Sequence, residues 1–257
     1  MKLNVTKNTQ LLKLIVRAIE KGVGEDVKEF MRTSDMATYN SIRMVRSDKI
    51  NTNIRNSVAS NTVQLKYFKR YGWTGCILID RENKTTYTIC SEKTLQSIPR
   101  KAGRNIPHYL QTLLYVENSS VVPQQMSLSD FMPEMKQMSL FDDEVYFEDY
   151  KSIMDEDISF DDGYVHLVIT YEAENCEIKS ITLRLLDKDF QNAQAHSLTS
   201  FLQPDFSVLT AEYDRASNKD AHSLVSVKVG LKGNSEVETN SNNQISTKVL
   251  LEEKRRD

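Results

Sequence analysis

The sequence predicts an α+β fold: a helical N-terminus followed by an antiparallel meander, an acidic linker, and a second antiparallel β-rich module with one helix. Three observations lead to this prediction. Apolar residues recur at helical spacing at the start of the chain, the period changes to two at Thr62, and the alternation returns after Gly163. We therefore divide the 257 residues into a basic α+β domain (1–116), an acidic linker (117–162) and an α+β antiparallel sheet domain (163–257).

Helices are predicted first. Residues 9–22 carry an apolar stripe, and Gly22-Val23-Gly24 ends or bends this helix before a second short helical piece that runs through Phe30. A further helix is expected to start at Ser34 or Asp35, with its apolar stripe formed by Met36, Tyr39, Ile42 and Val45.

Three strands with short turns are predicted next, at residues 62–68, 76–80 and 85–90. They form an antiparallel meander, because connections this short join neighbouring antiparallel strands. The apolar stretch 109–116 is predicted to be a helix because of its length and its leucine content.

The third region begins with a predicted hairpin of residues 164–171 and 177–186. Asp187 is expected to cap a helix that Pro204 ends. Strands are then predicted at residues 206–213, 223–231 and 244–251.

The net charge of −3 conceals a strong asymmetry along the chain. Residues 1–116 contain 20 Lys+Arg against 9 Asp+Glu, a net charge of +11, whereas residues 117–162 contain 2 against 13, a net charge of −11. Residues 163–257 carry a net charge of −3. An excess of +11 attracts a polyanion, so the first region indicates nucleic acid, unless the two segments only neutralise each other.

Cations in the helices, in the Lys69–Gly75 turn and in the Pro99–Arg104 loop are the candidate phosphate contacts, and the only tryptophan can stack on exposed bases. Each charge taken singly is also compatible with a solvated helix face, and the tryptophan with closure of the meander core. The predicted nucleic-acid-binding residues are Arg43, Arg46, Lys49, Arg55, Lys69, Arg70, Trp73, Arg100, Lys101 and Arg104.

The acidic segment contains Gln137-Met138-Ser139-Leu140-Phe141. This pentapeptide resembles the motif Gln-Leu-Ser/Asp-Leu-Phe with which bacterial polymerases and repair proteins bind the replication sliding clamp, with Met138 in the place of Leu. The resemblance implies that Gln137, Met138, Leu140 and Phe141 bind the clamp. An earlier phrase, Gln125-Met126-Ser127-Leu128, repeats four of the residues but lacks the following Phe. The alternative is that the apolar residues pack onto a neighbouring domain.

Other classes of protein are excluded or less favoured. No run of eighteen apolar residues and no signal peptide is present, so we expect a cytoplasmic protein without membrane contact. Cys76, Cys90 and Cys176 are too few and too scattered for a disulfide framework or a zinc site, and no cofactor fingerprint or catalytic motif occurs.

The chain as a whole also resembles uncharacterised proteins of low-GC bacteria and their phages, on the strand from Gly72-Trp73 to Asp80 and on Pro107-His108-Tyr109-Leu110. The preferred hypothesis is a non-enzymatic, DNA-associated protein without a cofactor, tethered to the sliding clamp.

Two alternatives stay open at this point. One is a metal-dependent nuclease, in which Glu177 and Lys179 act with Asp161 and Asp162. The other is a phage or host interaction protein whose acidic segment mimics nucleic acid and blocks a DNA-binding partner.

Overall fold

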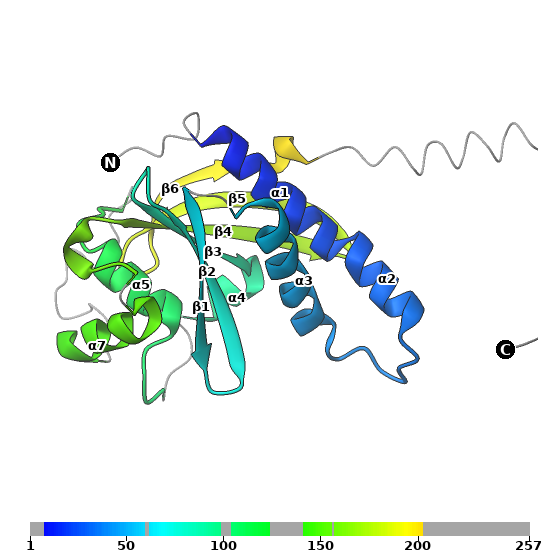
Figure 1. Ribbon diagram of the computed structural model, residues 1–257, viewed down its shortest axis with the longest axis horizontal. Helices are drawn as coiled ribbons and strands as arrows, with labels where there is room; N and C mark the ends of the chain where they lie inside the picture. Colours follow the sequence, from blue (N-terminus) through cyan, green and yellow to red (C-terminus); the bar gives the residue numbers. More distant parts are fainter. Residues whose placement is uncertain (1–7, 60–61, 99–103, 124–140, 156, 203–257) are drawn as a thin grey trace, which may run out of the picture. The chain divides into compact units, whose positions relative to one another are not determined.

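A six-stranded sheet organises the part of the chain that the structure describes (Figure 1). The computed structural model describes residues 8–59, 62–98, 104–123, 141–155 and 157–202. The strands follow one another across the sheet in sequence order, and every neighbouring pair is antiparallel except the parallel pair β3 and β4. The predicted α+β fold is confirmed. The strands are β1 (Val63–Arg70), β2 (Trp73–Asp80), β3 (Thr85–Ser91), β4 (Val165–Glu174), β5 (Glu177–Leu186) and β6 (Asn192–Ser197).

Helices cover both faces of the sheet (Figure 1). One face packs against α1 and α3, and the other against α4, α5 and α7. The helices are α1 (Thr9–Val23), α2 (Glu25–Thr33), α3 (Ile42–Ser57), α4 (Glu92–Ser97), α5 (Tyr109–Glu117) and α7 (Asp143–Met154), and two short 3₁₀ turns follow, η2 (Phe160–Asp162) and η3 (Thr199–Phe201).

The two apolar cores follow from the two-residue period of a strand. On β2, Leu78 points into the α1/α3 core, whereas Ile77 and Ile79 point into the α5/α7 core. On β4, Ile169 and Val168 are divided between the two cores in the same way. Because both faces are covered, these central strands are continuous apolar runs instead of strict alternations.

Several predicted elements are confirmed with small changes at their ends. They are the first helix and the piece after it, the three-stranded meander, the helix at 109–116, and the hairpin at 164–186. The hairpin turns at Asn175 and Cys176, which have φ angles of 48° and 63°. Positive φ at both central residues matches the right-handed twist of the two strands and gives the tight two-residue loop.

The third helix lies later in the chain than predicted. It begins at Ile42, so Met36 and Tyr39 belong to the connection before it and are exposed. Packing against α1 decides its position, because the buried stripe is formed by Ile50 and Ile54. The polar side chains between them disguise this stripe in the sequence.

The predicted division into domains 1–116 and 163–257 needs correction. Strand β3 pairs in parallel with β4 from Thr85↔Val165 to Ser91↔Tyr171, so one sheet joins the two regions. Residues 1–204 form one compact unit. The pairing of β3 with β4 is not evident from the sequence, because two parallel strands are joined by a long crossover connection. Here this connection contains the whole predicted linker.

Part of the predicted linker (117–162) is also helical. Helix α7 buries Tyr146, Tyr150, Ile153 and Met154 against the sheet and α5, while Asp143, Glu144 and Glu148 are exposed. The acidic run at its start is therefore the polar side of an amphipathic helix. Residues 124–140 lie outside the described residues.

The helix predicted between Asp187 and Pro204 is wrong. Residues 192–197 form the edge strand β6, and only 199–201 make a helical turn. Asp187 Oδ1 accepts hydrogen bonds from the backbone N–H of Asp189 (2.9 Å) and of Gln191 (2.7 Å), which closes a turn instead of capping a helix. The strands predicted at 206–213, 223–231 and 244–251 lie outside the described residues.

Candidate nucleic-acid cleft

A cleft of about 1320 Å³ lies where α3, the β1–β2 hairpin and the start of α4 meet. In Figure 1, α4 is seen between α3 and the β1–β2 hairpin. The floor comes from the carboxyl ends of β3 and β4, which are adjacent because Ser91 pairs with Tyr171. The segment 104–108 adds to the hairpin side. We call this feature the cleft.

The sequence places one face of α3 along the cleft by helical spacing. Arg43, Arg46, Ser47 and Ile50 line it, three or four residues apart. Ile50 is also part of the α1/α3 core, so the packing of this residue fixes the rotation of the helix. The two arginines are therefore held at the mouth by a rigid element.

Half of the predicted nucleic-acid-binding residues are brought together here. Arg43, Arg46, Arg70, Trp73 and Arg104 line the cleft although they come from three separate segments of the chain. Three other predicted residues do not line it, namely Lys49, Arg55 and Lys69. Arg100 and Lys101 lie outside the described residues.

The cations of the cleft differ in whether they already have an anionic partner. Arg70 forms an ion pair with Asp149 of α7 and donates to the carbonyl oxygen of Pro107. By contrast, four cleft cations form no ion pair with any described residue. They are Arg43, Arg46, Lys93 and Arg104.

Two of these arginines are partly withdrawn from water. The Nε atom of Arg46 is buried and has no hydrogen-bond partner among the described residues. Burial lowers the pKa of the Arg104 guanidinium from its ordinary value. A partly buried guanidinium without an anion loses hydration that nothing replaces. An anionic ligand in the cleft would supply the missing partner.

Aromatic rings form the opposite side of the cleft. The ring of Trp73 lies 5.3 Å from that of Tyr109, and the ring of His108 lies 4.4 Å from that of Tyr109. Trp73 also contacts Phe68 edge to face at 5.7 Å, so it contributes to the meander core as well, and it remains 38% exposed. Tyr71, at the tip of the hairpin, is 91% exposed.

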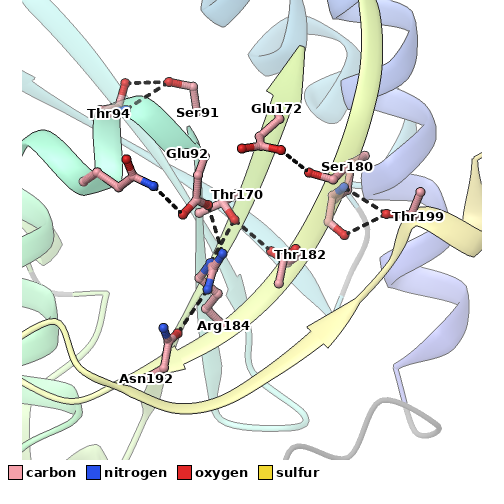
Figure 2. A network of polar contacts seen from close by, with 12 residues as sticks. Ser91, Glu92, Thr94, Thr170, Glu172, Ser180, Thr182, Arg184, Asn192 and Thr199 are labelled. Atoms are coloured by element: carbon pink, nitrogen blue, oxygen red, sulfur yellow. Dashed lines mark hydrogen bonds and ion pairs between the residues drawn. The ribbon is translucent and has the colours of Figure 1, made fainter.

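A polar network beside the cleft supplies a cationic partner for Glu92, the carboxylate at the start of α4 (Figure 2). Glu92 accepts from Arg184 at 3.1 Å, and Arg184 also donates to Thr170 (3.1 Å) and to Asn192 (3.2 Å). Figure 2 shows Arg184 bridging between strands toward α4. Because Glu92 is already neutralised, it opposes an anionic ligand less than a free carboxylate would.

A second polar cluster lies inside the core and not in the cleft. His166, Thr86, Thr88 and Glu117 are all buried. His166 Nδ1 lies 2.7 Å from Thr86 Oγ1, His166 Nε2 lies 2.9 Å from Thr88 Oγ1, and Thr86 donates to Glu117. Tyr150 on α7 donates to the other oxygen of Glu117 at 3.0 Å. The cluster joins α5 and α7 to the sheet.

The residues of the nuclease alternative are not brought together. Asp161 and Asp162 precede the first residue of β4, whereas Glu177 pairs with Glu174 at the last residue of β4. Ten strand residues separate the two ends, which is about 33 Å at the usual rise of a strand. Lys179 forms an exposed ion pair with Glu177 at 3.4 Å. These carboxylates cannot hold one metal ion.

In the described ranges, no group of three or more His, Cys, Asp or Glu side chains is placed to hold a metal ion. Likewise, none of the described helices has the length and apolar composition that crossing a membrane requires.

The pentapeptide that resembles a clamp-binding motif lies at the edge of the described residues. Gln137, Met138 and Leu140 fall outside them, and Phe141 directly precedes the N-cap of α7. The ring of Phe141 contacts that of Tyr146 edge to face at 6.0 Å, so the last residue of the motif packs on the helix that follows it.

Sequence reasoning missed some cleft residues. Tyr171 lines the cleft because β3 and β4 pair in parallel, and no local sequence pattern predicts this pairing. Lys93 lines the cleft because it lies on α4, a helix that was not predicted. A signal for α4 exists, since Ser91 caps the helix by accepting from the backbone N–H of Thr94 at 3.1 Å.

Fold and cleft together define an α+β protein with a basic cleft walled on one side by aromatic rings. The chain belongs to the DUF5986 family, a family of unknown function whose model matches residues 4–248. No curated protein and no solved structure matches the chain.

Proposed function

We propose that this protein associates with DNA through the cleft and is tethered to the replication sliding clamp by the peptide that precedes α7. The observation that carries the DNA part is the position of Arg43, Arg46 and Arg104 around one cleft, where none of them forms an ion pair with a described residue. Phosphate oxygens are suitable partners for guanidinium groups that form no ion pair, and two of the three, Arg46 and Arg104, are also partly desolvated. The proposed activity is binding, without a catalytic step.

The distribution of charge supports this proposal. The net charge of +11 in residues 1–116 is spread along the sequence, but the cations of the cleft come from α3, α4 and the 104–108 segment. Cations that converge from separate segments produce a stronger local field than the same charges spread over a surface. Such a field raises the rate at which a polyanion associates and makes its binding sensitive to salt.

The DNA part is tested by measuring the anisotropy of a fluorescently labelled oligonucleotide as the protein is added. We expect the double variant Arg46→Ala/Arg104→Ala to bind at least tenfold more weakly than the wild type at low salt. Each lost phosphate contact should also reduce the slope of log K against log salt by about 0.7 to 0.9.

A matched control for the DNA experiment is Arg55→Ala/Lys69→Ala, which removes the same charge from exposed residues outside the cleft. We expect it to retain most of the affinity. Equal losses in the two double variants would contradict a role for the cleft, because they would show that only net charge matters. Absence of binding by the wild type would contradict DNA association itself.

The clamp part rests on the pentapeptide and on its place beside a helix. Extended apolar residues such as Leu140 and Phe141 would each contribute about 1.5–3 kcal/mol when buried in a pocket of the partner. Gln137 would supply an amide that both donates and accepts at the rim of the pocket. The contact of Phe141 with Tyr146 would have to be exchanged for contacts with the clamp.

A purified bacterial sliding clamp is the ligand for this second test, measured by surface plasmon resonance or calorimetry. We expect Leu140→Ala/Phe141→Ala to abolish binding. The control is Leu128→Ala, in the related phrase that lacks the following Phe, and it should bind as the wild type does. The thermal stability of each variant alone is measured as well, because loss of the Phe141–Tyr146 contact would lower it, whereas loss of a contact with the clamp would not. Failure of the wild type to bind the clamp would refute the tether and leave the DNA proposal intact.

A further inference from the structure

We infer that the cleft takes a single strand of DNA in preference to a duplex, with bases on the hairpin side and phosphates on the α3 side. This inference rests on the proposed function, because it specifies the form of DNA that the same cleft binds. Four features of the described residues support it: the aromatic side, the cationic side, the size of the cleft and the exposed ring of Tyr71.

The aromatic side offers ring faces that only unpaired bases can use. Trp73 and His108 supply accessible rings here, and they flank the buried ring of Tyr109, with centroids 5.3 Å and 4.4 Å from it. In a duplex each base is stacked between its neighbours and presents only its edges in the grooves. In a single strand the faces of the bases are free to stack on aromatic side chains, and this stacking tolerates any sequence.

The cationic side is positioned for the backbone of the same strand. Arg43 and Arg46 stand one helical turn apart on α3, across the cleft from the hairpin. The buried Nε atom of Arg46 lacks a hydrogen-bond partner among the described residues, and a phosphate oxygen is an acceptor that could supply one. A groove with cations along the backbone and rings under the bases is the usual arrangement for binding a single strand.

The size of the cleft fits a segment of a strand better than a small molecule. Its volume of about 1320 Å³ exceeds the roughly 300–1,000 Å³ of ordinary ligand pockets. The lining extends from α3 to the β4–β5 hairpin, which supplies Glu174 and Lys179. A ligand that contacts both the arginines and the rings must therefore be elongated.

The exposed ring of Tyr71 gives a fourth indication. Tyr71 is the first residue of the two-residue loop that joins Arg70 to Trp73, and it has a φ angle of 51°. Glycine or asparagine adopts this conformation more easily than a bulky aromatic residue does. The two-residue hairpin turn requires this conformation at its first residue, so the turn holds the ring of Tyr71, which is 91% exposed, beside the cleft, where it is available to stack on a base.

Intrinsic fluorescence provides the experiment, because Trp73 is the only tryptophan of the chain and lines the cleft. Unlabelled single-stranded DNA of about twelve nucleotides is added to the full-length protein, and a blunt duplex of the same sequence is added in parallel. We expect the single strand to quench Trp73 and to bind at least tenfold more tightly than the duplex. Anisotropy with labelled strands measures both affinities independently of the quenching.

Variants of Tyr71 test where the bases lie. We expect Tyr71→Ala to weaken single-strand binding by about 5- to 150-fold, the range reported by alanine substitution of stacking rings. Tyr71→Phe should restore it, since stacking needs the ring and not the hydroxyl. Tyr67→Ala serves as control, because Tyr67 is an exposed tyrosine on β1 that does not line the cleft.

The possible outcomes separate this inference from the proposed function. Equal or tighter binding of the duplex would overturn the inference and leave DNA association standing. No binding of either form would defeat both. Single-strand binding without quenching, and without an effect of Tyr71→Ala, would refute the placement of bases on the hairpin side.

Discussion

The Nδ1 atom of His166 on β4 lies 3.8 Å from the Oε2 atom of Glu117 at the end of α5, and both side chains are buried. Desolvation raises the pKa of Glu117 from 4.5 to about 7 and lowers the pKa of His166 from 6.5 to about 3. In the folded protein each of these two side chains is therefore neutral over much of the pH range in which the same side chain is charged in the unfolded chain.

These two pKa shifts predict how stability depends on pH. The unfolded chain binds the His166 proton at a higher pH than the folded protein, so this residue lowers stability as pH falls from 6.5 to 3. Glu117 binds its proton more tightly in the folded protein, so it lowers stability as pH rises from 4.5 to 7. Their contributions oppose each other between pH 4.5 and 6.5.

Glu117→Gln removes the second effect only. We expect the free energy of unfolding of the wild type, measured by urea titration, to fall relative to the variant by about 1.4 kcal/mol per pH unit between pH 4.5 and 7. A difference between the two proteins that does not change with pH would contradict the assignment of the raised pKa to Glu117.

Gly22 is predicted to be intolerant of any side chain. A Cβ atom at this position would lie 2.8 Å from both the backbone nitrogen and the Cγ1 atom of Ile50. Because backbone cannot move away cheaply, α1 and α3 would have to separate. We expect Gly22→Ala to destabilise the protein by about 1–3 kcal/mol, in spite of the higher helix propensity of alanine. The control is Gly72→Ala, where no atom lies within 4 Å, and thermal unfolding distinguishes the two.

Arg70 is predicted to serve the fold more than the ligand. It is paired with Asp149, and only 14% of its side chain and 15% of that of Asp149 are exposed. Asp149 also accepts from Thr112 on α5, so the pair joins the hairpin to two helices. We expect Arg70→Ala to cost about 2–4 kcal/mol of stability, because it leaves Asp149 as a buried, unpaired carboxylate.

A double-mutant cycle checks this assignment of Arg70. Arg70→Ala/Asp149→Ala should recover part of the stability lost in Arg70→Ala, since the unpaired carboxylate is gone. The loss of DNA affinity at a temperature where the variants are folded should stay smaller for Arg70→Ala than for Arg46→Ala. The reverse order would show that Arg70 contacts the ligand directly.

Tyr71→Gly should separate stability from binding. Glycine adopts the positive φ angle at this position without strain, whereas the conformation costs other residues about 1–2 kcal/mol. Glycine also raises the conformational entropy of the unfolded chain, which lowers stability. We therefore expect a stability equal to that of the wild type or up to about 1 kcal/mol higher, together with weaker binding of single-stranded DNA. Differential scanning calorimetry measures the first quantity, and a clear loss of stability would show that the ring supports the fold.

Local periodicity was sufficient to predict the meander, the 164–186 hairpin and the first helices, because their stabilising contacts lie close in sequence. It failed at α7, where acidic residues on the solvent side concealed the buried tyrosines of an amphipathic helix. It also failed after Asp187, where a few apolar residues at helical spacing belong to a turn and an edge strand.

The candidate site was predicted in part for a related reason. Arginine and tryptophan are candidate nucleic-acid contacts wherever they occur in a sequence, so Arg43, Arg46 and Trp73, which line the cleft, were among the predicted residues. Whether a cation lines the cleft depends on the face of the element that carries it, and this separates Arg46 from Lys49 and Arg70 from Lys69. The convergence itself depends on the parallel pairing of β3 with β4, which is a property of the whole fold.

That parallel pairing has a consequence for the nascent chain. When β1, β2 and β3 have left the ribosome, residues 92–164 must still be translated before β4 arrives. At the usual rate of about 5–20 residues per second, the free edge of β3 stays open for roughly 4–15 s. An open edge next to apolar strands is a template for pairing with another chain. Translation arrest within 92–164 should therefore yield an aggregation-prone fragment, while arrest after β4 and β5 should not.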